Sequence, residues 1–232
     1  LTGIHLSSYG IDCDSSLLEL IQTLHEINGI ERIRLGSLEP GIITEDFVQA
    51  LVKLPKVCPH FHLSLQSGSS TVLKRMNRRY TPEEYLEKCD LLRQYYEHPA
   101  ITTDIIVGFP GETEEEFKET CDFVKKVDFY EVHVFKYSKR NGTVAASMPD
   151  QIKESVKAER SGILMELAEK QKKEFIDYYK GKEVSVLFEE PVEVDGVRYF
   201  EGLTPEYVKV WVPTEENLTN RIMKVEFFPY LY

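Results

Sequence analysis

Side chains that could bind a polar ligand follow several apolar segments of the sequence, namely Glu39, Gln66, Asp104 and Glu112. Glycines accompany them at Gly36, Gly68, Gly108 and Gly111. Carboxylates accept hydrogen bonds from amines and ribose hydroxyls, an amide can bind a carboxylate or a hydroxyl, and glycines let a ligand approach the backbone closely. The combination indicates a site for a nucleoside-like ligand.

Each of these side chains also has a purely structural interpretation. Glu39 and Pro40 could simply end a strand, and residues 108–111 could form only a tight turn. Asp104 is harder to explain in this way, because it interrupts the apolar run 101–107 and a buried carboxylate without partners costs several kcal/mol.

The histidines offer a second interpretation. His60 and His62 face the same side of a strand, and with His5, His133 and Asp104 they could form the metal site of a barrel hydrolase. These two histidines open their strand, however, so we expect them toward the end opposite the rim where parallel α/β folds place their sites. This placement counts against the hydrolase.

The four cysteines, Cys13, Cys58, Cys89 and Cys121, are widely and irregularly spaced, and no C-x-x-C occurs. The sequence therefore contains no zinc or iron–sulfur motif. Cys89 and Cys121 lie where apolar helix faces would place them, and we interpret them as small buried hydrophobes of a protein in the reducing cytoplasm.

The formal net charge is −11, which argues against phosphate binding by the whole surface. Binding to nucleic acid would have to use local basic patches, of which there are two: Lys74, Arg75, Arg78 and Arg79, and Lys136, Lys139 and Arg140. Each could equally be a solvated face. No apolar run approaches the roughly 20 residues that a transmembrane helix needs, so we expect no membrane contact.

Strand and helix patterns alternate over the first two-thirds of the chain. Strands are predicted near 4–6, 32–35, 62–65, 101–107 and 131–135, with helices between them, two of which open with capping boxes at Thr81 and Thr113. Such alternation implies a parallel sheet, and a closed eight-stranded barrel needs about 250 residues. The sequence therefore predicts an α/β fold with a partial, open parallel βα barrel.

The last part of the chain has another composition. A long helix over 151–179 precedes short alternating segments at 183–188, 207–212 and 221–227, with a hairpin turn at Asp195-Gly196. These features predict a small antiparallel β-barrel. We expect a domain boundary near Lys180, which gives domains 1–180 and 181–232.

Six ordered motifs carry a family resemblance: LTGIHLSSYG at 1–10, RIRLGSLEP at 32–40, HLSLQSG at 62–68, LKRMNRRY at 73–80, TDIIVGFPGET at 103–113 and HVFKYSKRNGT at 133–143. Together they resemble the radical S-adenosylmethionine methylthiotransferase family. The C-terminal part resembles the family's small RNA-binding β-barrel, the TRAM domain. The resemblance covers essentially the whole chain.

The resemblance extends to one branch of that family. HLSSYG and RLGSLEP look most like the branch that acts on threonylcarbamoyladenosine in tRNA. The isopentenyladenosine branch and the ribosomal-protein branch remain alternatives, as does a non-catalytic RNA-binding module.

The resemblance implies methylthiolation of an unactivated C–H bond, at carbon 2 of the modified adenosine beside the anticodon. It implies S-adenosylmethionine and two 4Fe–4S clusters as cofactors, a tRNA substrate and a monomer. The first cluster would be held by C-x-x-x-C-x-x-C, which this sequence lacks. The chain opens on an apolar segment without Met, so we expect the cluster loop upstream of Leu1 and an inactive fragment. The resemblance thus supplies no catalytic residue and no metal ligand within this chain.

The resemblance does supply a cofactor shell. Glu39, Gln66 and Asp104 match family positions on the cofactor-facing rim, and Gly108 and Glu112 match a segment that generally approaches adenine. Further candidates follow the last strand of the barrel, namely Tyr137, Ser138 and Arg140.

For RNA, the resemblance favours Arg75, Arg78 and Arg79 as a substrate-contacting group. In the C-terminal part, aromatic side chains could stack on bases or pack in the barrel core: Tyr199, Phe200, Tyr207 and Trp211.

Overall fold

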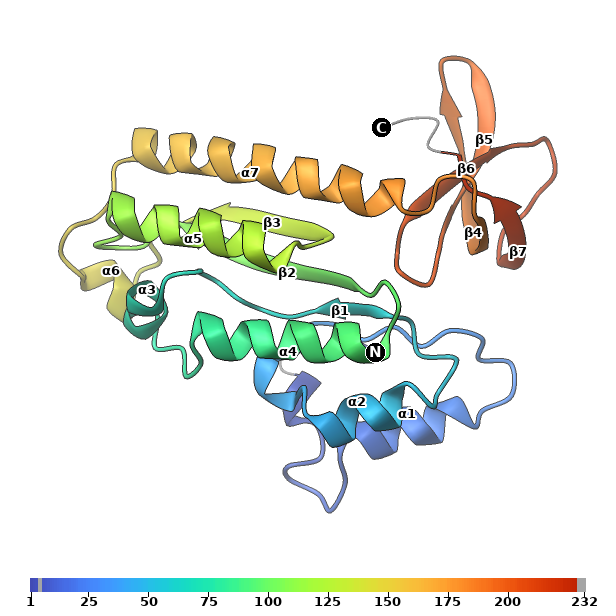
Figure 1. Ribbon diagram of the computed structural model, residues 1–232, viewed down its shortest axis with the longest axis horizontal. Coiled ribbons are helices and arrows are strands. Elements are labelled where there is room, and N and C mark those ends of the chain that lie inside the picture. Colours follow the sequence, from blue (N-terminus) through green and yellow to red (C-terminus); the bar gives the residue numbers. More distant parts are fainter. Residues whose placement is uncertain (4–5, 229–232) are drawn as a thin grey trace.

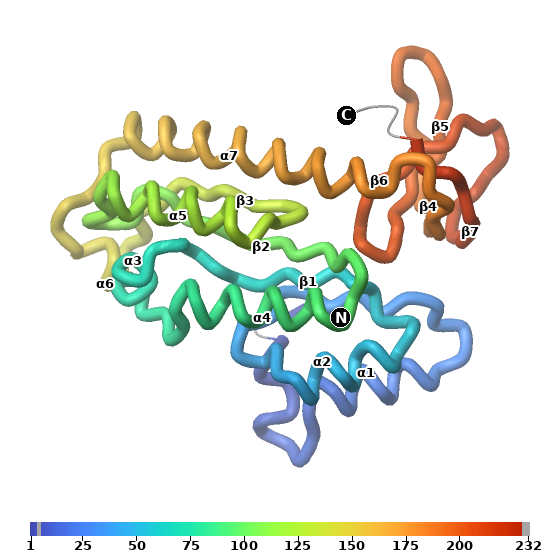
Figure 2. The backbone as a smooth tube through the Cα atoms, in the orientation of Figure 1, coloured from blue at the N-terminus to red at the C-terminus, as the bar shows by residue number. Residues whose placement is uncertain are grey.

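A computed structural model describes residues 1–3 and 6–228 of the chain. It consists of a helix-covered parallel sheet, along which a long helix runs, and a C-terminal antiparallel sheet beyond the carboxyl end of that helix (Figures 1 and 2). Within the described residues, no helix is both long and apolar enough to cross a membrane.

The elements of the first part follow one another as η1 (Leu6–Ser8), α1 (Leu17–His25), η2 (Pro40–Ile42), α2 (Glu45–Leu51), β1 (His60–His62), α3 (Ser70–Arg75), α4 (Pro82–Tyr95), β2 (Ala100–Val107), α5 (Glu114–Val127), β3 (Glu131–Lys136), α6 (Val144–Ser147) and α7 (Glu154–Asp177). The C-terminal sheet consists of β4 (Glu183–Val194), β5 (Val197–Leu203), β6 (Lys209–Pro213) and β7 (Arg221–Glu226).

The parallel sheet has the strand order β1-β2-β3. Isolated parallel bridges extend it, joining Ile33 to Val57, Leu38 to Leu63 and Gln66 to Ile105. On the far side of the Ile33 segment, the amino group of Leu1 donates to the Arg34 carbonyl, and the Leu1 carbonyl accepts from Gly36. The extended segments thus lie side by side in chain order, as the alternating pattern predicts.

Two predicted strands differ in detail. The segment 32–35 is extended but forms only the isolated bridge from Ile33 to Val57. Ile33 bonds to Lys56 and Cys58 on one side, and Arg34 and Gly36 bond to Leu1 on the other. In the predicted strand 4–6, residues 4 and 5 lie outside the described residues, and Leu6 belongs to η1.

The predicted capping boxes are present. Thr81 and Glu84 exchange side-chain and backbone hydrogen bonds at the start of α4, and Thr113 and Glu116 do so at the start of α5. A third box at Ser16 begins α1. Each cap satisfies backbone N–H groups that the first turn of a helix leaves unpaired.

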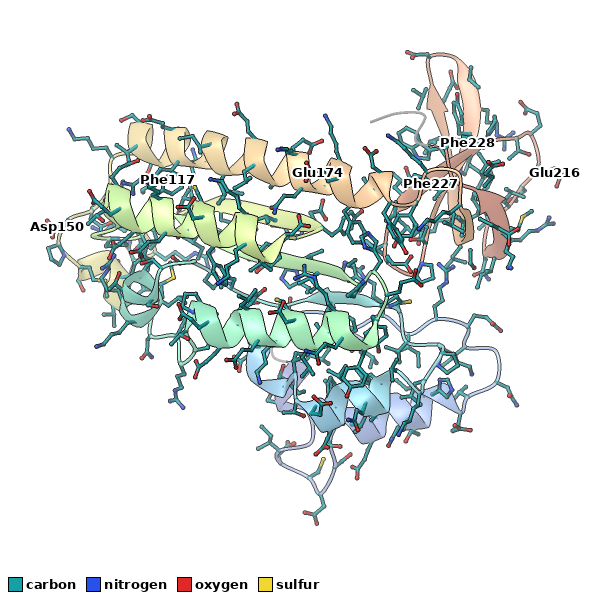
Figure 3. The ribbon with its side chains drawn as sticks, in the orientation of Figure 1. Phe117, Asp150, Glu174, Glu216, Phe227 and Phe228 are labelled. Carbon is teal, nitrogen blue, oxygen red and sulfur yellow. The ribbon has the colours of Figure 1, made fainter. Side chains whose placement is uncertain are left out.

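Helices cover one face of the parallel sheet. Residues such as Ile105 and Val107 of β2 are buried in a core that includes Phe117 and Val124 of α5. Helix α7 packs against β3, β2 and α5, and Phe117 lies where α5 faces α7 (Figure 3). The opposite face carries the other, alternate residues of each strand. These residues form the site described below.

The C-terminal sheet is antiparallel with the order β6-β5-β4-β7, and Asp195-Gly196 forms the predicted turn between β4 and β5. Its core residues Phe188 and Phe200 share one apolar cluster with Ala100, Tyr130 and other residues of the first part. Ala100 opens β2 and Tyr130 precedes β3. The second sheet therefore packs at the amino-terminal ends of the parallel strands.

Candidate functional site

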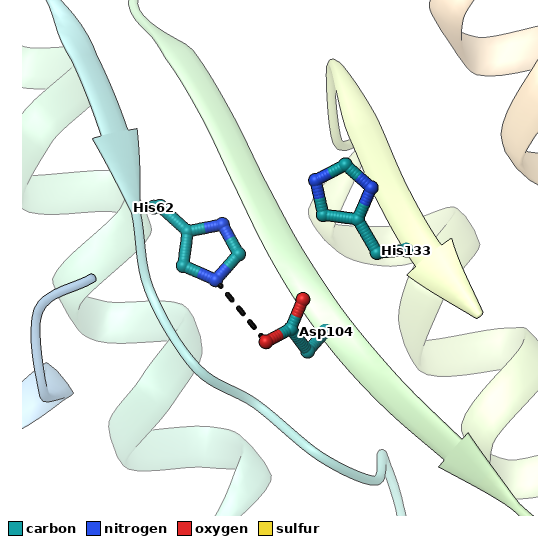
Figure 4. A group of neighbouring side chains, drawn as sticks. All are labelled: His62, Asp104 and His133. Atoms are coloured by element: carbon teal, nitrogen blue, oxygen red, sulfur yellow. Dashed lines mark ion pairs between the residues drawn. The ribbon is translucent and has the colours of Figure 1, made fainter. Parts of the chain in front are cut away.

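The inner face of the parallel sheet, opposite the helices, carries polar side chains. In the strand register His62 stands beside Thr102, and Asp104 stands directly beside His133. Because alternate residues of a strand share a face, His62, Asp104 and His133 project from β1, β2 and β3 to the same side (Figure 4). They form a cluster at the centre of this inner face.

Distances within this cluster are short. His62 Nε2 lies 3.4 Å from Asp104 Oδ2, and His62 Nδ1 lies 3.0 Å from Thr102 Oγ1. The rings of His62 and His133 are stacked with their centroids 5.9 Å apart. The cluster therefore combines two imidazoles and one carboxylate, with a buried hydroxyl that orients one imidazole.

A pocket of about 490 Å³ opens between this cluster and the amino-terminal ends of the strands. His62 and His133 line it on one side, and Arg34, His60 and Tyr207 line its base. The volume lies within the usual range for a small-molecule pocket, about 300–1,000 Å³.

Tyr207 closes the base of the pocket from the loop between β5 and β6. The guanidinium carbon of Arg34 lies 3.3 Å from the centroid of the Tyr207 ring, and the His60 ring lies 5.3 Å from it. Burial lowers the pKa of His60 to about 3, so this imidazole is neutral at physiological pH. Of Arg34, His60 and Tyr207, only Arg34 therefore carries a positive charge at the base of the pocket.

The predicted rim residues Glu39 and Gln66 lie beyond the cluster, toward the carboxyl ends of the strands. Gln66 is buried with a left-handed φ of 73°, and its backbone pairs with the Asp104 carbonyl and the Ile106 N–H. Glu39 is exposed, and its N–H donates to Ser7 Oγ. The rim and the pocket are therefore two different parts of the inner face, and Asp104 and its cluster lie between them.

The loop after β2 is held together by Glu112. Its Oε1 accepts from the Gly108 N–H at 3.0 Å and from Arg160 Nη1 at 2.6 Å. Burial raises the pKa of Glu112, while the Gly108 N–H and Arg160 oppose that rise. The Glu112 carboxylate thus binds groups of the protein itself. If the predicted Gly108–Glu112 segment contacts a cofactor, it would do so through atoms other than Glu112 Oε1.

Tyr137, Ser138 and Arg140 follow β3 in the same neighbourhood. The Tyr137 N–H donates to the Val107 carbonyl, and its ring packs edge-on against Phe109 with centroids 5.3 Å apart. Its Oη is buried and has no hydrogen-bond partner among the described residues, which makes it a candidate donor to a ligand. Ser138 and Arg140 are exposed.

The predicted RNA-contacting arginines divide into two groups. Arg75 makes a two-pronged ion pair with Glu116, at 2.8 and 2.6 Å, and donates to the Gly111 carbonyl. Arg78 and Arg79 are exposed. The first arginine anchors α3 to α5, and the other two present their charge to solvent.

The aromatic residues of the C-terminal sheet also divide. Phe200 is buried in the core, and Tyr207 faces the pocket of the inner face. Tyr199 and Trp211, with ring centroids 6.5 Å apart, line a separate pocket of about 500 Å³ together with Phe228. Only this last pair could offer stacking surfaces of the predicted kind.

Three functional contacts had no signal in the sequence. Lys157 and Arg160 of the long predicted helix were not among the predicted site residues, yet both are buried. Lys157 Nζ donates to the Tyr137 carbonyl, and Arg160 binds Glu112. Tyr207 read as a base-stacking or core residue of the C-terminal part.

Comparison with protein families identifies the fold. The profile of the Radical SAM superfamily matches residues 2–124, more than half of the 232 residues. The chain belongs to the radical SAM superfamily. Coproporphyrinogen III oxidase from Escherichia coli, a radical SAM enzyme, superposes with a TM-score of 0.54 and 18% identity over 66% of this chain and 36% of that chain, a likeness in fold alone.

Curated relatives of this radical SAM chain are tRNA-modifying enzymes. Threonylcarbamoyladenosine tRNA methylthiotransferase MtaB of Bacillus subtilis is 41% identical over 99% of this chain and 52% of its own length. A tRNA-2-methylthio-N(6)-dimethylallyladenosine synthase of Thermoanaerobacter is 49% identical over 82% of this chain and 41% of its own length. The methylthiotransferase resemblance is confirmed, and the chain spans about half the length of these relatives.

An iron–sulfur cluster does not fit the cysteines of this chain. C-x-x-x-C-x-x-C is absent from residues 1–232. Cys58, Cys89 and Cys121 are buried and Cys13 is exposed. Burial raises the pKa of the Cys89 thiol to about 12, whereas a cluster ligand is a thiolate. No step through a cluster is therefore assigned to these residues.

Proposed function

We propose that this chain is part of a tRNA methylthiotransferase. The observation that carries this proposal is its similarity to such enzymes over as much as 99% of its length. The proposed organisation is a cofactor-binding domain over residues 1–180 and an RNA-binding domain over residues 181–232.

The proposed cofactor is S-adenosylmethionine, held on the inner face at the rim. Glu39 and Asp104 would accept hydrogen bonds from its ribose hydroxyls and amino group, and the Gln66 amide would bind its carboxylate. The buried Gln66 side chain and the unpartnered Tyr137 Oη support this position, because both offer polar atoms to a ligand. When bound, the cofactor supplies the chemistry that activates an unreactive C–H bond.

Saturation-transfer NMR with S-adenosylmethionine tests the cofactor site without requiring catalysis. We expect saturation of the adenine and ribose protons by the wild-type chain. The signal should weaken in Asp104→Asn and Gln66→Ala and persist in Glu115→Gln, which alters an exposed carboxylate on α5. Equal signals in all four proteins would remove these residues from the proposed site.

The proposed substrate is tRNA with a modified adenosine beside the anticodon, in the threonylcarbamoyl form that the HLSSYG and RLGSLEP motifs favour. The second candidate is the dimethylallyl form, which the 49% identity to the Thermoanaerobacter enzyme favours. Because C-x-x-x-C-x-x-C is absent, we propose that the chain by itself is inactive.

RNA binding is proposed to use the exposed Arg78 and Arg79. Fluorescence anisotropy with a tRNA anticodon stem-loop should show affinity that falls as salt rises, since arginine–phosphate contacts release counterions. The double variant R78A/R79A should reduce the slope of log K against log salt by about 1–2. Lys170→Ala removes another exposed charge on α7 and serves as the control. An unchanged slope in the double variant would exclude this patch.

A further inference from the structure

Three adjacent parallel strands direct His62, Asp104 and His133 toward one point of the inner face (Figure 4). One ligand atom from each side chain lies within 4.8 Å of the other two. We propose that these three residues form a binding site for a divalent transition-metal ion. The proposal rests on this geometry and does not depend on the proposed function.

The donor set fits such an ion. Two imidazole nitrogens and one carboxylate oxygen suit Zn²⁺, Co²⁺, Ni²⁺ and Fe²⁺. Bonds of about 2.0–2.1 Å place two ligand atoms of one ion roughly 3.0–3.4 Å apart. His62 Nε2 and Asp104 Oδ2, at 3.4 Å, already have this separation. His133 is exposed, so its ring can rotate to complete the set.

His62 is oriented as a ligand should be. Its Nδ1 lies 3.0 Å from Oγ1 of Thr102, a residue that is almost fully buried. With Nδ1–H donating to that hydroxyl, the lone pair of Nε2 points toward Asp104. A metal-binding histidine commonly uses its second nitrogen in this way, which fixes both its tautomer and the direction of its ring.

The surroundings leave room and charge for the ion. The pocket of about 490 Å³ borders His62 and His133, so water can complete the coordination. Arg34 is directed to the base, where it lies on the Tyr207 ring, and Glu131 is paired with Lys172 at 2.6 Å. Asp104 therefore supplies the negative charge nearest to the proposed ion.

Asp104 also belongs to the proposed cofactor shell. A metal ion and S-adenosylmethionine would therefore compete for the Asp104 carboxylate. Metal binding measured without S-adenosylmethionine keeps the two proposals separate. Loss of metal binding would leave the cofactor proposal intact, and loss of cofactor binding would leave the metal site intact.

The test is titration of the purified chain with Co²⁺, followed by its visible d–d absorption and by calorimetry. We expect one bound ion per chain. His62→Ala and His133→Ala should each weaken binding at least about tenfold, and Thr102→Val, which removes only the orienting hydroxyl, should weaken it roughly tenfold. His25→Ala removes an imidazole on α1, outside the cluster, and should bind as the wild type does.

A second readout does not require variants. Paramagnetic broadening of NMR signals by bound Co²⁺ should centre on His62, Asp104 and His133. The proposal is overturned if the wild-type chain develops no d–d band, if broadening centres elsewhere, or if correctly folded His62→Ala and His133→Ala proteins bind as tightly as His25→Ala.

Discussion

The ion pair between Arg160 of α7 and Glu112 holds the loop after β2, and its removal is predicted to be costly. The two side chains are 6% and 3% exposed, and Arg160 Nη1 lies 2.6 Å from Glu112 Oε1. Replacing Arg160 with Met leaves a buried carboxylate that retains only the Gly108 N–H. Breaking a buried pair from one side typically costs about 3–5 kcal/mol.

This loss is large enough to measure directly. At about 2–4 °C per kcal/mol for a chain of this size, the melting temperature of Arg160→Met should fall by roughly 6–20 °C. Arg198→Met is the matched control, because Arg198 is 42% exposed and its partner Glu215 is 87% exposed. An exposed pair of this kind is worth about 0–1 kcal/mol.

The pH dependence of the loss identifies its cause. Burial already raises the pKa of Glu112 in the folded protein, and removing Arg160 should raise it further. A carboxyl whose folded pKa lies above its unfolded value stabilises the fold at low pH, and this contribution is lost as pH rises through the folded pKa. The deficit of Arg160→Met should therefore shrink toward pH 4.5 and grow toward pH 8.

The measurement is differential scanning calorimetry of four proteins across this pH range: wild type, Arg160→Met, Arg198→Met and the double variant R160M/E112Q. The double variant removes both charges and should recover much of the stability. The reasoning is refuted if Arg160→Met melts within the range of Arg198→Met, or if its deficit does not change with pH.

Two further predictions concern the same loop and its neighbour. Gly108 has φ +73° and a Cβ there would collide with Lys157 Cγ, so Gly108→Ala should lower the melting temperature more than Gly196→Ala, which has φ +76° and open space. Equal losses would show that the backbone angle alone matters. Glu116 has its pKa lowered to about 2, chiefly by its hydrogen bond with Arg75. This contribution is present above pH 4.5 and is lost as pH falls toward 2, so acid titration of thermal stability should be shallower for Glu116→Gln than for wild type, and parallel curves would contradict the assignment.

The sequence was sufficient to predict the elements that local rules control. Alternation of apolar segments with capped helices predicts the parallel sheet, and the boxes at Thr81 and Thr113 place two helix starts at the observed residues. Asp195-Gly196 predicts its hairpin in the same way. Periodicity, caps and turns depend on near neighbours in the chain, so a sequence contains the information they need.

The sequence did not reveal which side chains the fold uses to hold itself together. Arg75 looks like a free cation of a basic patch, but it pairs with Glu116, 41 residues later. Arg160 meets Glu112 across 48 residues. Tyr207 reaches a pocket of the first sheet from the loop between β5 and β6. Such contacts depend on the packing of distant elements, for which a single sequence has no local signal.

The central claim, that this chain carries methylthiotransferase specificity for tRNA, is tested most directly by mass spectrometry of tRNA nucleosides. The matching segment of the Bacillus subtilis relative would be replaced by this chain, and the chimera expressed in cells that lack that enzyme. We predict that 2-methylthio-threonylcarbamoyladenosine reappears, and that it does not when the chain carries Asp104→Asn at equal expression. A well-expressed chimera that forms no methylthiolated nucleoside would contradict the claim, and methylthiolation of dimethylallyladenosine instead would assign the chain to the other branch.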